Sequence, residues 1–314
     1  MYNNNTTVVD CQEELIDKTA TGKIRPWRIY KLNNSYISEA YKTFDVNKAR
    51  RLDDCATWLE FERTDNGMKL HNANFCRVRL CPICAWRRSL KTYGQVSAVV
   101  EKLGDNYAYV FLTLTCRNCS ADELSDTITH LFKSLDLLMK YKACKQAFKG
   151  FFRGLEITHN MTDDTYHPHF HLLIAVNPSY FSSRYYLSQD KITALWKRAL
   201  KASYTPIVDV RKIKGKKSKA IAEVAKYATK SSDIICFDDW DLTCDTVRVL
   251  DMALANRRLT GWSGVLKQAH KELHLDDNED GDLIHTQDID DKTEDEVQTI
   301  AYTWHTGYSQ YMRI

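Results

Sequence analysis

The stretch Tyr166-His-Pro-His-Phe-His-Leu-Leu-Ile-Ala-Val176 is the most informative part of this chain. Its apolar second half predicts a β-strand over 169–176. Side chains alternate along a strand, so His169 and His171 share one face, about 7 Å apart at Cα, and can converge on one divalent ion. An apolar strand has no packing reason to carry two histidines on one face, although two surface or satisfied core histidines remain the alternative. His167 lies off the strand, and we interpret it as a bystander.

The strand expected before it, over 151–158, supplies a third candidate ligand. Glu156 stands there between Leu155 and Ile157, and a buried acid without a partner costs several kcal/mol. Antiparallel pairing across the intervening polar loop would bring Glu156 beside the histidines. Two imidazoles and one carboxylate leave open positions on the ion for water and phosphate oxygens, and this donor set suits Mg²⁺ or Mn²⁺.

Strands and helices mix along the chain without a regular βαβ alternation. Further strands are expected over 107–115 and 206–213, and helices over 120–141, 189–201, 220–229 and 245–275. This pattern predicts an α+β fold, with a central antiparallel sheet of about five strands flanked by helices and a helical C-terminal part. We divide the chain into a leader of uncertain order with irregular structure (1–50), a Cys-rich zinc-binding region (51–92), a domain that contains the histidine strand (93–235) and a helical, acidic C-terminal region (236–314).

A cysteine cluster precedes the predicted sheet. Cys76, Cys81 and Cys84 have the close spacing of zinc ligands, and Pro and Arg residues between them are poor core material. We prefer Cys55 over His71 as fourth ligand, because four thiolates make a closed structural Zn²⁺ site. Free cysteines in a core are the alternative.

Charge is unevenly distributed, although the net charge is only +3. The block 191–230 holds twelve Lys or Arg against two acids, and the block 271–298 holds twelve acids against two Lys. The basic block is suited to a polyanion such as DNA, or it forms a solvated helix face. We select as candidate DNA-binding residues Lys214, Lys216, Lys217, Lys226, Lys230, Arg87 and Arg88.

The expected helix over 220–229 carries Glu223 and Tyr227 one turn apart, with Lys230 on the same stripe. A tyrosine between an acid and lysines is a candidate nucleophile toward phosphate. Taken alone, an amphipathic helix with one tyrosine is equally consistent with a purely structural role.

Together, these motifs resemble the HUH endonuclease superfamily, and more narrowly the rolling-circle plasmid replication initiators of small Gram-positive plasmids. The resemblance covers about residues 50–275, and its motifs are 111–115, 167–174, 223–230 and the cysteine region 75–88. It implies that Tyr227 is the nicking nucleophile, forming a 5′-phosphotyrosine and freeing a 3′-OH. It also implies that Glu223 activates water for the terminating cleavage and that His169 and His171 bind the catalytic metal.

The expected partners are plasmid origin DNA, with its hairpin or single-stranded nick site, and host helicase and replication machinery, with a homodimer or higher oligomer possible. A transposase or relaxase of the same superfamily, or a zinc-stabilised DNA-binding regulator without catalysis, are the alternatives. The absence of a long apolar run and of a signal-peptide pattern leads us to expect a cytoplasmic protein without membrane association.

Overall fold

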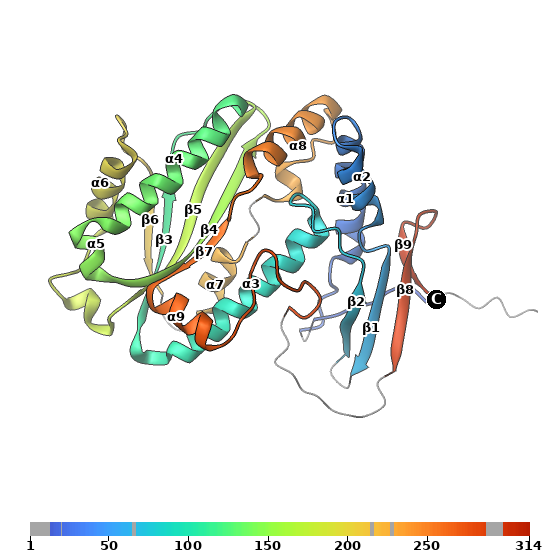
Figure 1. Ribbon diagram of the computed structural model, residues 1–314, viewed down its shortest axis with the longest axis horizontal. Helices are drawn as coiled ribbons and strands as arrows, with labels where there is room; N and C mark the ends of the chain where they lie inside the picture. The colour runs from blue at the N-terminus through green and yellow to red at the C-terminus, as the bar shows by residue number, and fades with distance from the viewer. Residues whose placement is uncertain (1–12, 20, 65–66, 214–216, 227–228, 287–297) are drawn as a thin grey trace, which may run out of the picture.

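The computed structural model describes residues 13–19, 21–64, 67–213, 217–226, 229–286 and 298–314. Its elements are arranged around two antiparallel sheets, which lie toward opposite ends of the long axis in Figure 1, with helix α3 running between them. The helices are α1 (Trp27–Lys42), α2 (Val46–Asp54), α3 (Pro82–Leu103), α4 (Ala121–Lys140), α5 (Lys142–Ala147), α6 (Gln189–Leu200), α7 (Ser218–Val224), α8 (Trp240–Leu254) and α9 (Gly264–Glu272). The strands are β1 (Trp58–Thr64), β2 (Gly67–Ala73), β3 (Ala108–Thr115), β4 (Phe148–Asn160), β5 (Thr165–Val176), β6 (Val208–Lys212), β7 (Thr260–Ser263), β8 (Thr299–His305) and β9 (Gln310–Arg313).

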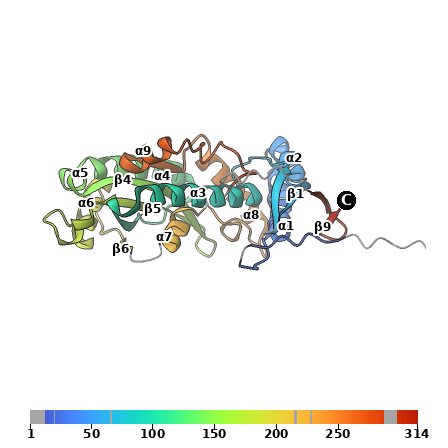
Figure 2. The ribbon, with the colours of Figure 1, turned by 90° about the horizontal axis from the view of Figure 1, so that it is seen from below.

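The larger sheet has the strand order β6-β3-β5-β4-β7, so β5 lies at its centre. Side chains of alternate residues enter two separate cores. One core contains Leu172 and Ile174 of β5 with residues of α4 and α6, and the other contains Leu173 and Ala175 with residues of α3, α7 and α9. Figure 2 shows this sheet from another side, with helices on both of its faces. The predicted α+β fold with a five-stranded antiparallel sheet is therefore confirmed.

The smaller sheet, with the order β2-β1-β8-β9, joins segments far apart in the sequence. β1 pairs with its hairpin partner β2 on one side and with β8, near the other end of the chain, on the other. The C-terminal region, which the sequence predicts to be helical, therefore contributes the two strands β8 and β9 to this sheet. Tyr302 and Tyr311 of these strands are buried and contribute to the core.

Residues 27–54 form helices α1 and α2, so the expectation of irregular structure after the leader is wrong there. The inward face of α1 carries polar residues that a search for apolar periodicity passes over. Asn34 donates to the carbonyl of Leu52 (2.5 Å), and Ser38 donates to that of Ala49 (2.9 Å). These bonds give the side-chain donors of Asn34 and Ser38 partners in the backbone, so a helix without a clean apolar stripe still packs against α2.

Two helix predictions in the second half of the chain also differ from the structure. The helix expected to reach residue 229 ends at Val224, because the chain turns there and Lys230 reaches Glu156 on β4. The helix expected over 245–275 is interrupted by β7, which adds an edge strand to β4. In both places a tertiary contact overrides the local helical pattern.

Candidate metal-centred active site

Strand pairing brings the two histidines and the acid together in the middle of the larger sheet. On neighbouring strands, Glu156 of β4 is directly opposite His169 of β5, and Gly154 is opposite His171. All three ligand-type side chains are buried, with 4 to 9% of each residue exposed. The Glu156 Oε2 atom lies 3.0 Å from Nε2 of His171 and 3.7 Å from Nε2 of His169. The two strands joined by the polar loop therefore bring Glu156 beside His169 and His171, as the sequence predicts.

Each imidazole is also held from behind through its other ring nitrogen. Nδ1 of His171 lies 3.1 Å from Oγ1 of Thr113 on β3, and Nδ1 of His169 lies 3.0 Å from the carbonyl oxygen of His167. When Nδ1 carries the proton, it donates a hydrogen bond to these oxygens, and the lone pair of Nε2 is free to bind a metal ion. Such outer partners orient the histidines of metal sites.

Thr113 joins this cluster through its hydroxyl, although the local sequence there indicates only a β-strand. Its pairing with His171 across β3 and β5 is a matter of register, which no local pattern states. The expectation that His167 lies off the strand is wrong, because β5 begins at Thr165, and the main-chain carbonyl of His167 contacts Nδ1 of His169.

The Glu156 carboxylate stays ionised in this buried place. Burial acts to raise its pKa, but hydrogen bonds from His169, His171 and Lys230 outweigh burial and hold the pKa well below its usual range. Lys230 Nζ lies 3.0 Å from the second oxygen, Oε1. For Lys230 itself, burial acts to lower the pKa, but the bond to Glu156 raises it overall. A negative charge is thus held beside the two imidazoles.

The end of α7 and the residues that follow it lie against this cluster. Oε1 of Glu223 is 4.0 Å from Nε2 of His171, and the same atom accepts a bond from Lys226 at 2.5 Å. Tyr227 lies outside the described residues, but Glu223 and Lys230, before and after it in the chain, both reach the His–Glu cluster.

The donor set of this cluster fits a divalent ion. Nε2 atoms of His169 and His171 and an oxygen of Glu156 lie within 4.8 Å of one another. Two buried imidazoles and one buried carboxylate are suitable ligands for a divalent metal. The site can therefore hold a metal ion.

The four cysteines 55, 76, 81 and 84 form a second, separate cluster, in which all four are buried and no pair is disulfide-bonded. Sulfur–sulfur distances are 3.6 Å from Cys55 to Cys81, 3.7 Å from Cys55 to Cys84 and 3.7 Å from Cys76 to Cys84. Ligands at 2.3 Å in a tetrahedron around Zn²⁺ stand about 3.8 Å apart. The spacing therefore matches a closed tetrathiolate site.

Local structure explains how these thiols meet. Cys55 follows the end of α2, whereas Cys81 caps the N-terminus of α3 and Cys84 lies in the first turn of that helix. The N-terminus of a helix favours thiolates. His71, the alternative fourth ligand, is instead half-exposed on β2, with Nδ1 2.6 Å from the carboxylate of Glu62.

The candidate DNA-binding residues differ in burial and in the groups that they contact. Arg87 is buried, and it donates to the carbonyls of Leu283 (2.8 Å) and Ile284 (2.5 Å). Arg88 donates to the carbonyl of Glu279 at 3.3 Å, so both arginines of α3 contact the acidic segment of the chain. Lys217 Nζ lies over the ring of Tyr109 at 4.8 Å, and Lys214 and Lys216 lie outside the described residues.

An antiparallel sheet with a buried His-x-His strand, an adjacent acid and a separate four-cysteine cluster defines a class of α+β protein with two distinct clusters of metal-ligand type. Comparison with known proteins gives the particular family. The profile described as replication protein matches residues 67–312. The chain belongs to this family, the Rep replication initiators.

Curated relatives support this over nearly the whole length. A protein called Protein rep from Bacillus amyloliquefaciens is 40% identical, over 95% of this chain and 96% of the relative. Relatives of the same name from Lactiplantibacillus plantarum and from Streptococcus pneumoniae are each 36% identical, over 94% and 95% of this chain and 97% and 94% of their own lengths. No solved structure matches the chain.

None of the helices in the described part of the chain combines the length and the apolar character needed to cross a bilayer.

Proposed function

We propose that this protein starts rolling-circle replication of a plasmid by nicking one strand of the double-strand origin. The oxygen of Tyr227 would attack the scissile phosphate, forming an O–P bond as the bond from phosphorus to the 3′ oxygen breaks. The phenol loses its proton and the departing 3′ oxygen takes one up, which gives a 5′-phosphotyrosine and a free 3′-OH primer. Tyr227 is assigned through its neighbours, because Glu223 and Lys230 both contact the His–Glu cluster.

The observation that carries this proposal is the arrangement of the two Nε2 atoms around one carboxylate oxygen, beside the segment 223–230. His169, His171 and Glu156 would hold Mg²⁺ or Mn²⁺, which would polarise the scissile phosphate. Lys230 and Lys226 add positive charge at the same place and would contact phosphate oxygens, with Lys214, Lys216 and Lys217 extending the grip on DNA.

Glu223 would end the reaction. A second cleavage without a second tyrosine needs another nucleophile, and water requires a base within hydrogen-bond reach of the phosphate. The Glu223 carboxylate is 38% exposed and lies within 4.0 Å of His171, so it can accept a proton from water at the same centre. Strand transfer back to the first cut would then release the product.

The cysteine cluster would hold Zn²⁺ in a structural role. Its thiols are buried away from the His–Glu cluster and leave no open position. Its position at the start of α3, the helix that runs toward the larger sheet, supports a role in folding rather than in the reaction.

Origin DNA, presented as a hairpin or a single-stranded nick site, would be the substrate in the cytoplasm. Host helicase and replication proteins, and a second copy of the chain, are the further partners that we propose.

The test uses supercoiled plasmid carrying the origin, incubated with the protein and Mn²⁺. We expect nicked circles and a covalent protein–DNA adduct that maps to Tyr227 by mass spectrometry. Tyr227→Phe removes only the hydroxyl, so it should retain the band shift and lose nick and adduct. A regulator without catalysis would shift the band in both cases without nicking, and full nicking by the Phe variant would overturn the assignment of Tyr227.

A further inference from the structure

The loop after α9 has the sequence pattern of a calcium-binding loop. Loops of the form Asp-x-Asp/Asn-x-Asp/Asn-Gly bind Ca²⁺ through side chains at positions 1, 3 and 5 and through the main-chain carbonyl at position 7. Here these positions are occupied by Asp276, Asn278, Asp280 and Asp282, with Gly281 at position 6. Position 12, a bidentate Glu in such loops, is Gln287, which lies outside the described residues.

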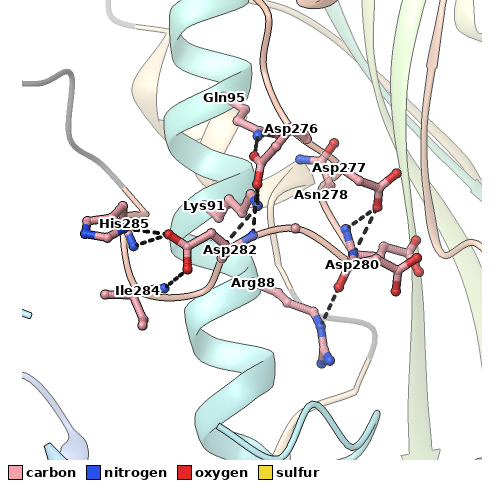
Figure 3. A network of polar contacts seen from close by, with 12 residues as sticks. Arg88, Lys91, Gln95, Asp276, Asp277, Asn278, Asp280, Asp282, Ile284 and His285 are labelled. Carbon is pink, nitrogen blue, oxygen red and sulfur yellow. Dashed lines mark hydrogen bonds and ion pairs between the residues drawn. The ribbon is translucent and has the colours of Figure 1, made fainter. Parts of the chain in front are cut away.

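A cation is already present in this loop, and it belongs to the protein. The Lys91 ammonium on α3 contacts the carboxylate of Asp276 and, at 2.9 Å, the carbonyl of Asp282, which are positions 1 and 7 (Figure 3). Only 3% of the Lys91 side chain is exposed. A Cβ on Gly281 would collide with both the ammonium and the Asp276 carboxylate, so the turn is closed tightly around the positive charge.

A neighbouring side chain of the kind that binds hard cations contacts the same carboxylate. Gln95, 93% buried, donates through Nε2 to Asp276 Oδ1 at 2.8 Å and to the Asp276 carbonyl at 3.0 Å. Its amide oxygen is buried and has no hydrogen-bond partner in the described part of the chain. Amide oxygens are ligands that Ca²⁺ takes readily.

The side chains at positions 3 and 5 contact other residues instead of the Lys91 ammonium. Asn278 Oδ1 accepts from the indole of Trp262 on β7 at 2.6 Å, and Asp280 is 86% exposed beside Arg258. The loop therefore offers an anionic oxygen and a carbonyl to one small cation, which a single ammonium satisfies, while Asn278 ties the loop to the larger sheet.

We propose that residues 276–282 form a cation-binding loop whose resident cation is the ammonium of Lys91, and which takes a hard divalent cation of the Ca²⁺ type once that ammonium is removed. The tethered charge joins the acidic loop to α3 without any metal. This assignment is independent of the nicking function.

The test compares the full-length protein with Lys91→Met, which keeps the length of the side chain and removes the charge. Calorimetric titration with CaCl₂ should give a binding isotherm in the variant that is absent from the wild type. Millimolar Ca²⁺ should also raise the thermal midpoint of the variant by several degrees and leave that of the wild type unchanged. Adding Asp276→Asn to Lys91→Met should abolish both responses, which separates this loop from the His–Glu cluster.

Two results would overturn the proposal: a Lys91→Met variant that folds but does not respond to Ca²⁺, or a wild type whose Ca²⁺ response is equal and is lost on Asp276→Asn. If Lys91→Met does not fold alone, its refolding yield is measured with and without Ca²⁺. Recovery only with Ca²⁺ would support the proposal, and no recovery in either condition would reject it.

Discussion

The carbonyl oxygen of Val224, at the end of α7, lies 2.8 Å from the position that a Cβ would take on Gly154 of β4. Gly154 is opposite His171 across the strand pair. The missing side chain therefore lets the segment that leads to Tyr227 lie directly on the strand beside the metal-type site.

Gly154→Ala should separate these two parts. A methyl group at 2.8 Å from a backbone oxygen forces one of them to shift, at a cost of about 1–3 kcal/mol. We expect a folded protein with a thermal midpoint lower by a few degrees, and nicking at least about tenfold slower, because small misplacements of reacting groups are costly. Circular dichroism melts and single-turnover nicking measure these effects. The control is Gly307→Ala, whose Cβ would contact only the side chain of His305; equal nicking by both variants would contradict the prediction.

Thr113→Val should weaken metal binding while preserving shape. The variant loses the oxygen that lies 3.1 Å from Nδ1 of His171, so the imidazole is no longer held with Nε2 toward Glu156. Loss of such an outer partner weakens metal binding about 10–100-fold. We expect a matching rise in the Mn²⁺ concentration for half-maximal nicking, with direct Mn²⁺ titration as a second measure.

Thr113→Ser should restore the wild-type Mn²⁺ requirement. The matched control is Thr115→Val on the same strand, since Thr115 donates to the carbonyl of Ile207 rather than to a histidine. That variant should lose stability and keep its Mn²⁺ affinity. Unchanged Mn²⁺ affinity in Thr113→Val would show that the hydroxyl does not position His171.

Glu223→Ala should separate initiation from termination. The first cleavage relies on Tyr227 and should persist with the covalent adduct, whereas the second lacks its base and should leave over-long products. Because Glu223 also pairs with Lys226, Lys226→Ala serves as the control: it breaks the pair but keeps the carboxylate, so it should weaken DNA binding and leave termination normal. Normal termination by Glu223→Ala, or an equal defect in Lys226→Ala, would favour a merely structural pair. Gel analysis of replication products distinguishes these outcomes.

Cys84→Ser should lower both zinc content and stability, because thiolate coordination contributes directly to folding. Cys84 contacts two other sulfurs of the cluster at 3.7 Å, so the remaining thiols cannot close the tetrahedron. Elemental analysis and thermal melts are the measurements, with Cys244→Ser, outside the cluster, as control. Absence of bound zinc from the undamaged wild type would refute the Zn²⁺ assignment.

Short-range patterns in the chain were enough to predict the central strands, the shared face of His169 and His171 and the meeting of four cysteines. Each follows from the two-residue alternation of a strand or from close ligand spacing. Glu156 could be predicted as a third ligand because the loop between its strand and the histidine strand is short. Two strands joined by a short loop pair antiparallel and lie side by side.

Other features depend on which elements meet in three dimensions. α1 is helical because its polar face bonds to the backbone of α2 and the residues after it, and the end of α7 is set by Gly154 and by the bond from Lys230 to Glu156. The bond of Thr113 to His171 depends on strand register, and that of Lys91 to Asp276 joins residues 185 positions apart. Local sequence states which groups need partners, but which distant group satisfies them is decided only when the packed chain brings the two together, because the free energy of burying a polar group depends on that partner.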